Sequence, residues 1–223
     1  FNIGTKNNGS NGSIDIYIRG AGPTVGHIFS TAEPFDGEWH HVVFVQDELE
    51  RSIYVDGELD DLEIAAKPES GWDNIDATTI GGILRGTAGY WVTGLIDDVG
   101  IWKRALSADE VSELTESGIP SGAGELVPGL IAYWDFDNAD NIVDLIQGLP
   151  GEVQGEVETA EGKLGGAVDL GEAQNWIKVD AEASGWLAPA SDADQMTVSL
   201  WQKLHVVKSS STFWFRAEAA GSN

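Results

Sequence analysis

The chain has 223 residues, of which 42% are hydrophobic, and this is enough for a sizeable core in one large domain or two small ones. Its 37 acidic and 12 basic residues give a formal net charge of −25, which argues against nucleic-acid and anionic membrane partners because phosphate groups would be repelled. The absence of cysteine excludes disulfides, thiol catalysis and cysteine-ligated metals. The sequence contains no run of eighteen apolar residues, the length that a membrane-spanning helix needs.

Short runs of alternating apolar and polar residues, bounded by Gly, Asn and Asp, predict β-strands along the whole chain. The clearest lie at residues 13–19, 41–45, 51–55, 94–102, 130–134 and 197–201. Asp56-Gly57 predicts a tight hairpin after the third of these runs, because both residues tolerate a positive φ. The expected fold class is therefore all-β.

One short helix is predicted after residue 107. Ser107 can cap its first turn, and Glu110, three residues later, can reach back to complete a capping box. Val111 and Leu114 give the helix an apolar face, and Gly118 ends it.

A linker rich in Gly and Pro is predicted at residues 118–128, and it divides the chain almost in half. The two halves, residues 1–117 and 129–223, are not similar to each other, so the chain is not a simple internal duplication.

Two motifs in the first half resemble the laminin-G-like module, a jelly-roll sandwich of concanavalin A type. They are DGEWHHVVF at residues 36–44 with IYVDG at 53–57, and GLIDDV at 94–99 followed by the predicted helix. In that family these motifs mark the second half of a module. Motifs that resemble its first half stand later in this chain, at residues 130–137, 165–170 and 196–201.

The order of the motifs implies that residues 1–117 and 129–223 are complementary halves in permuted order. Joining the end of the chain to its start would pair residues 213–216 with 1–4 as a hairpin. Three arrangements fit: a circular permutant, one period of a tandem array cut at an arbitrary phase, or a swapped polymer in which each chain completes its neighbour. We favour the tandem array, because a chain that begins in mid-strand without Met is more easily part of something longer.

A structural calcium ion is expected from the resemblance, with Ca²⁺ held where the first and last strands of the module lie side by side. Its candidate ligands are carboxylates, which calcium prefers: Asp97, Asp98, Asp135, Asp137 and Asp144. The alternative is that these are turn caps and solvated surface acids.

Carbohydrate binding would need exposed aromatic rings with polar groups beside them. Trp72, Trp91 and Trp186 stand in loop-like surroundings and are the candidates, with covers of the sandwich ends as the alternative. The remaining tryptophans considered have apolar strand contexts and are expected in the core: Trp39, Trp102, Trp134 and Trp201.

No catalytic residue is expected. Glu58-x-Asp60-x-x-Glu63 matches the motif of laminarinase-like glycosidases, but it follows a hairpin turn and can arise by chance in so acidic a chain. His40 and His41 point to opposite faces of a strand, so they cannot jointly bind a metal; one is expected to be buried and the other exposed.

The sequence thus predicts a non-enzymatic extracellular or cell-surface module with a structural and adhesive role, which repeats in a filament or large surface protein. Its expected partners are copies of itself. The alternative is a lectin-like module that binds a polysaccharide.

Overall fold

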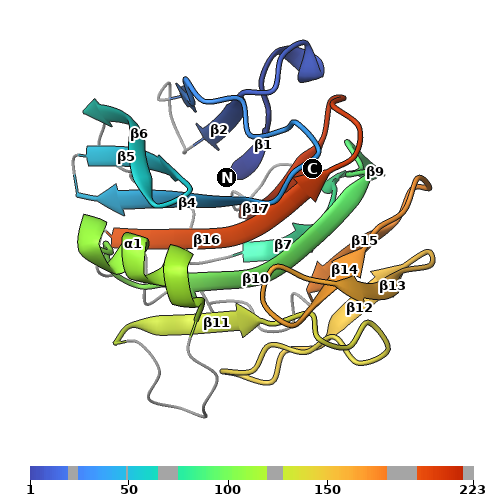
Figure 1. Cartoon of the computed structure of the whole chain (residues 1–223). Helices are drawn as coiled ribbons and strands as arrows, with labels where there is room; N and C mark the ends of the chain where they lie inside the picture. The colour runs from blue at the N-terminus through green and yellow to red at the C-terminus, as the bar shows by residue number, and fades with distance from the viewer. Residues whose placement is uncertain (20–24, 49, 65–74, 120–127, 180–194, 218–223) are drawn as a thin grey trace.

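The computed structural model describes residues 1–19, 25–48, 50–64, 75–119, 128–179 and 195–217. In these residues, two antiparallel sheets pack face to face, with one helix lying across the second sheet (Figure 1). The fold is the expected antiparallel jelly-roll sandwich. The central part of the linker, residues 120–127, lies outside the described ranges.

Seven of the described strands form the first sheet, in the order β12 (Gly151–Gln154), β15 (Trp176–Val179), β7 (Ile75–Ile80), β17 (Ser211–Ala217), β1 (Asn2–Thr5), β2 (Ile14–Arg19) and β3 (Val25–Phe29). Eight form the second, in the order β13 (Glu158–Glu161), β14 (Gly166–Asp169), β10 (Gly94–Trp102), β16 (Gln195–Leu204), β4 (His40–Asp47), β5 (Glu50–Val55) and β6 (Glu58–Ile64), with β11 (Leu130–Trp134) also paired to β10.

Three short elements complete the described structure. A hairpin of β8 (Ile83–Arg85) and β9 (Thr87–Gly89) packs on the outer face of the first sheet, where Ile83 contacts Ala77 and Trp214. A 3₁₀ turn, η1 (Lys6–Gly9), follows β1. The helix α1 (Ala108–Ser117) follows β10.

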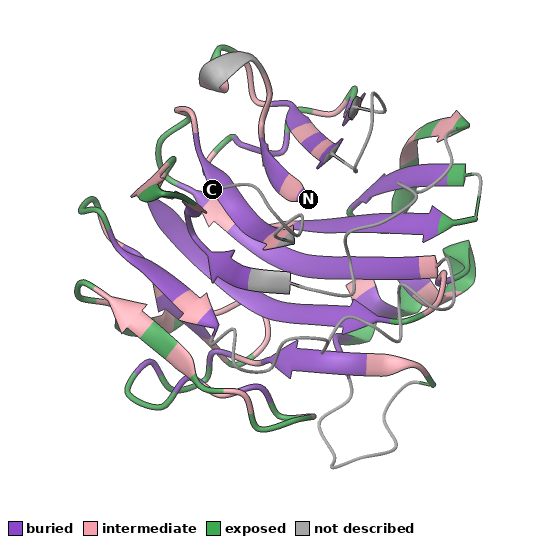
Figure 2. Ribbon diagram, turned by 180° about the vertical axis from the view of Figure 1, so that it is seen from behind, coloured by how far each residue is buried: buried purple, intermediate pink, exposed green. Residues whose placement is uncertain are grey.

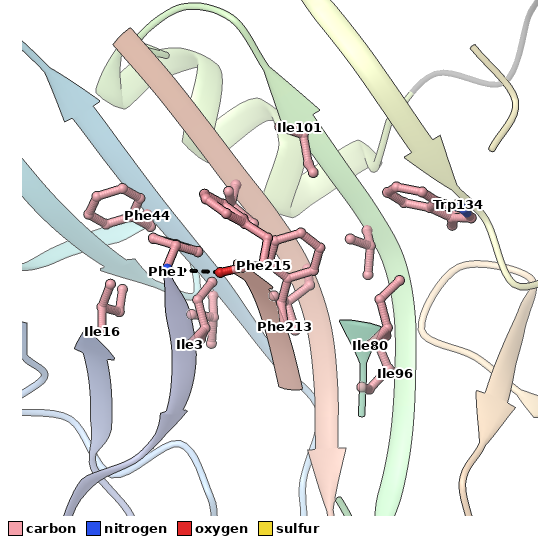
Figure 3. Close-up of a cluster of buried hydrophobic side chains, with 14 of the residues drawn as sticks. Phe1, Ile3, Ile16, Phe44, Ile80, Ile96, Ile101, Trp134, Phe213 and Phe215 are labelled. Atoms are coloured by element: carbon pink, nitrogen blue, oxygen red, sulfur yellow. Dashed lines mark hydrogen bonds between the residues drawn. The ribbon is translucent and has the colours of Figure 1, made fainter. Parts of the chain in front are cut away.

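Strands from the two sequence halves are interleaved at the centre of each sheet. β16 lies between β10 and β4, with Val198 opposite Ile101 on one side and Phe44 on the other. β17 lies between β7 and β1, and the Phe1 amine donates a hydrogen bond to the Phe215 carbonyl at 3.1 Å (Figure 3). β1 and β17 pair antiparallel, as the sequence predicted for residues 1–4 and 213–216. Residues 218–223 lie outside the described ranges.

The main core fills the space between the sheets. Alternation along each strand turns every second side chain inward, and the inward set is rich in Ile, Val and Phe. Phe1 stacks on Phe215 at 5.1 Å between ring centroids and lies 5.1 Å from Phe44 of the opposite sheet (Figure 3). The central strands of both sheets are buried along most of their length (Figure 2).

A second, smaller core lies between the helix and the outer face of the second sheet. Ser107 caps α1 and forms the predicted capping box with Glu110, while Val111 and Leu114 face the sheet as expected. They pack with Val43, Val45 and Trp102 and other side chains. Asp56 and Gly57 take positive φ values of 51° and 87° at the hairpin between β5 and β6, which confirms the predicted turn.

Of the tryptophans expected in the core, Trp102, Trp134 and Trp201 are buried, but Trp39 is only half-buried. Trp39 immediately precedes β4, so it lacks a sheet neighbour on each side to cover it. His41 is buried as expected, but His40 is half-buried rather than exposed. His41 is 2% exposed, whereas His40 lies between the carboxylates of Asp36 and Asp56 at the surface.

Cross-linking can test whether the two halves pair within one chain. Asp47 and Gln195 are register partners, and their side chains are 2.7 Å apart. Antiparallel partners have Cα separations of about 4.5–5.5 Å, within the disulfide range. The natural chain has no cysteine that could interfere. We therefore expect the double variant D47C/Q195C to form an intrachain disulfide on oxidation, detected by non-reducing electrophoresis and peptide mapping. Covalent dimers of the double variant, with D47C alone as the control, would contradict intrachain pairing.

Buried His41 should make the fold sensitive to acid. Its ring hydrogen-bonds Thr115 Oγ1 at 2.6 Å and Ser199 Oγ at 2.7 Å, and burial lowers its pKa from 6.5 to about 4. The unfolded chain therefore binds a proton at His41 between pH 6.5 and 4 that the folded chain does not, so the contribution of His41 to stability falls by about 3 kcal/mol as pH falls through this window. The raised pKa values of Asp97 and Asp98 act in the opposite direction over the same range, so the contribution of His41 is read from the difference between wild type and variant.

We expect H41Q to remove most of this pH-dependent loss in the free energy of unfolding, measured by urea denaturation at several pH values. H205Q, at an exposed position, is the matched control and should retain the wild-type slope. An unchanged slope in H41Q would contradict the assignment.

Candidate functional site

A bulge in β10 gathers the candidate acidic residues. The pairing of β10 with β16 shifts register between Asp97 and Gly100, and Asp98 has a φ of 48°. On its other side β10 pairs with β11, with Val99 opposite Trp134. Because β11 ends one residue before Asp135, this pairing brings Asp135 and the following loop towards the bulge, as the resemblance implied.

Asp97 is the most enclosed of these acids, with 0% exposure. Its Oδ2 accepts hydrogen bonds from the backbone N–H groups of Lys163 at 2.8 Å and Leu164 at 3.1 Å. Its Oδ1 is buried and has no hydrogen-bond partner among the described residues. Burial, together with the charge of Asp98, raises the pKa of Asp97 to about 7.

Asp98 is 4% exposed and accepts a hydrogen bond from the Tyr133 hydroxyl. Burial raises its pKa to about 6; the bond from Tyr133 opposes this shift, and the charges of Asp135 and Asp137 add to it. The negative charges of Asp98, Asp135 and Asp137 therefore repel one another where β10 and β11 meet. Their mutual repulsion is a property that a bound cation would relieve.

The turn at residues 162–166 fits closely over the acids. Asp137 Oδ1 accepts a hydrogen bond from the Gly166 N–H at 2.5 Å. A Cβ at Gly162 would lie 2.6 Å from Asp97 Oδ2, and one at Gly165, where φ is 82°, would lie 2.4 Å from Asp137 Oδ1. Glycine at both positions lets the backbone approach the carboxylates.

Asp144 has a separate task. Its carboxylate accepts hydrogen bonds from the backbone N–H groups of Tyr133 at 2.7 Å, Ile146 at 3.1 Å and Gln147 at 2.7 Å. These contacts stabilise the turn after β11 and tie it back to that strand. Burial nevertheless raises the pKa of Asp144.

The acids fit calcium only in part. The orphaned Asp97 Oδ1 is an available oxygen inside a carboxylate cluster, which suits a hard cation. However, no group of three or more His, Cys, Asp or Glu side chains in the described part of the chain is placed to hold a metal ion. Calcium at this site stays a prediction, and it would require the carboxylates to converge on Asp97.

The tryptophan candidates do not form a described platform. Trp91 is half-buried in the segment before β10, its Nε1 is buried, and its carbonyl accepts a hydrogen bond from Ser210 Oγ at 3.1 Å. Trp72 and Trp186 lie outside the described residues.

The glycosidase-like motif lies on β6, the edge strand of the second sheet. Asp60 accepts hydrogen bonds from the Thr31 N–H and hydroxyl and from the Ala32 N–H, which fastens the loop after β3 to this strand. Glu63 lies 4.0 Å from the buried guanidinium of Arg51. Two of the three motif acids therefore have structural contacts.

Sequence reasoning identified the acids but missed the groups that organise them, Tyr133 and the turn at 162–166. The close spacing of Gly162, Gly165 and Gly166 was the available signal for a tight backbone approach.

Together, the two face-packed antiparallel sheets, the covering helix and the pairing of β10 with β11 define a jelly-roll sandwich of the lectin and glucanase type. A laminin-G family model, described as the concanavalin A-like lectin/glucanases superfamily, matches residues 1–112. The chain belongs to this superfamily.

A curated relative is the human adhesion G-protein coupled receptor D1. It is 29% identical over 105 residues, which cover 47% of this chain and 12% of the receptor. The chain therefore matches only a small part of that protein. No solved structure gives a significant match. In the ranges described, α1 is too short and too polar to span a bilayer.

A calcium titration tests the acidic site. A cation between Asp97 and its neighbours would offset the repulsion that raises their pKa values, so we expect calcium chloride to raise the melting temperature at pH 7.5 and a chelator to reverse it. Ligand at 100 times its dissociation constant stabilises a fold by about 2.7 kcal/mol.

D97N should abolish most of this calcium response, whereas D140N, which removes an exposed acid from the same loop region, should keep it. An equal melting temperature with and without calcium, or an equal response in D97N, would contradict a calcium site at this bulge.

Proposed function

We propose that this chain is a non-enzymatic extracellular module with a structural and adhesive role, and that it repeats within a filament or large surface protein. The observation that carries the proposal is the position of β16 between β10 and β4. Residues 129–217 supply the central strand of a sheet whose other central strands come from residues 1–117.

This complementarity supports a repeating arrangement. Without β16, the facing edges of β4 and β10 would expose unpaired backbone groups and the inward side chains of both strands. Each first half therefore needs a second half, and this need can be met by the same chain or by an adjoining copy. A polymer of such units would hold its modules together through sheet pairing.

The surface charge suits this role. A net charge of −25 keeps closely spaced modules from associating with unrelated acidic surfaces. Calcium at the β10 bulge would offset part of that charge and stiffen each module.

A role without catalysis is supported by the contacts of β6. The Asp60 carboxylate is engaged by Thr31 and Ala32, and the relative that matches this chain is named an adhesion receptor. The alternative function is a calcium-dependent carbohydrate-binding module, which the lectin part of the superfamily's description favours.

A bead assay tests the adhesive role. We expect beads that carry the folded chain to cluster with one another, or to be retained on polysaccharide films, several-fold more than beads that carry the same chain after heat denaturation. Calcium and a chelator would be compared in parallel. Equal behaviour of folded and denatured coats on every surface would contradict an adhesive function.

A further inference from the structure

The outer face of β2 and β3 carries a cluster of aromatic side chains that the functions above leave unused. Ile16 and Ile28 are opposite one another and point into the core. Alternation therefore places the next cross-strand partners, Tyr17 with His27 and Asp15 with Phe29, on the outside of the sandwich. We call these four residues the β2–β3 aromatic face.

The rings form a continuous strip across the two strands. The centroids of Tyr17 and His27 are 4.6 Å apart, and those of His27 and Phe29 are 5.6 Å apart with an interplanar angle of 20°. Lys6 Nζ lies 4.3 Å from the centroid of Phe29 and ends the strip on one side.

A carboxylate fixes the polar group at the centre of the strip. His27 Nδ1 lies 2.8 Å from Asp15 Oδ1 and 3.0 Å from Asp15 Oδ2. With its proton held at Nδ1 by Asp15, a neutral His27 presents Nε2 as an acceptor. No described residue hydrogen-bonds Nε2, and the His27 side chain is 43% exposed.

The other end of the same sheet face is closed. There the β8–β9 hairpin covers Trp214, which is 4% exposed, by packing Ile83 and Leu84 against it. No described element covers His27 in this way. Cross-strand ring contacts alone would stabilise the sheet, but they do not require a half-buried carboxylate that orients an outward-facing ring nitrogen.

Charge selects the kind of ligand. Lys6 and Asp15 carry opposite charges near Phe29, so this face is close to neutral although the molecule carries −25. Anionic ligands would be repelled by the molecule as a whole. A ligand that combines apolar C–H surface with neutral hydroxyl groups matches both the rings and the oriented acceptor.

We propose that the β2–β3 aromatic face binds a neutral oligosaccharide. The C–H surface of a pyranose ring packs across the strip formed by Tyr17, His27 and Phe29, and one sugar hydroxyl donates a hydrogen bond to His27 Nε2. Asp15 is a positioning residue that holds the imidazole. This site rests on the carbohydrate-binding form of the proposed function and names a surface for it.

The test uses the full chain with a panel of neutral hexasaccharides: cellohexaose, laminarihexaose, xylohexaose, mannohexaose and chitohexaose. We expect saturation-transfer NMR to show contact with the ring protons of at least one sugar, and the His27 Nε2 resonance to shift on titration. Loss of one hydrogen bond and one stacking contact should weaken binding about tenfold in H27A and in Y17A.

H205A removes an exposed histidine elsewhere and should bind like the wild type. D15N should change the protonation pattern of the two His27 nitrogens and weaken the same sugar, a readout that general loss of stability would not produce. Absence of binding to every sugar of the panel overturns the proposal, as does binding that H27A and Y17A leave unchanged.

The two levels of the hypothesis fail differently. Beads coated with H27A that still cluster or adhere like the wild type, with no sugar binding by either protein, would leave the adhesive function standing and remove this site. Beads that never adhere, together with sugar binding that depends on His27, would remove the adhesive role and keep the site.

Discussion

The double pairing of β16 is the constraint on which the rest of the sandwich depends. Its backbone is hydrogen-bonded to β10 on one side and to β4 on the other, so it closes two strand edges at once. Its inward side chains, such as Val198 and Leu200, fill the main core. Its outward Ser199 bonds His41, and its Thr197 accepts the Leu106 N–H just before the helix. One strand thus links the backbone network, the main core and the position of α1.

The acidic bulge shows how the same sheet tolerates charge. Regular pairing would leave no room for two adjacent carboxylates inside a sheet, and the register shift after Asp97 creates that room. Backbone N–H groups from the turn at 162–166 and the Tyr133 hydroxyl then solvate part of the charge in place of water. The raised pKa values of Asp97 and Asp98 indicate that this solvation is incomplete.

Local signals made much of the fold predictable. The capping box at Ser107 and the turn at Asp56-Gly57 follow from residue types and spacing that act over a few positions. The antiparallel pairing of β1 with β17 was expected from the order of the motifs along the chain, since its partners are more than 200 residues apart. The features that sequence reasoning missed are set by contacts between distant segments. Trp39 is half-buried because it precedes its strand, and the ladder from Tyr17 to Phe29 depends on which residues of β2 and β3 are opposite each other. Periodicity gives the face of a side chain but not its partner across the sheet.

The position of β16 also affects the order in which the fold can form during synthesis. The hydrogen bond between His41 and Ser199 joins residues 158 positions apart. β4 and β10 therefore remain without their shared partner β16 until it leaves the ribosome, long after both of them. Contacts of such long sequence separation slow folding and leave strand edges open in the meantime. A nascent first half therefore has a period of vulnerability to mispairing and aggregation. In a tandem array, a preceding copy of residues 129–217 would already be available to end that period as soon as β4 and β10 emerge.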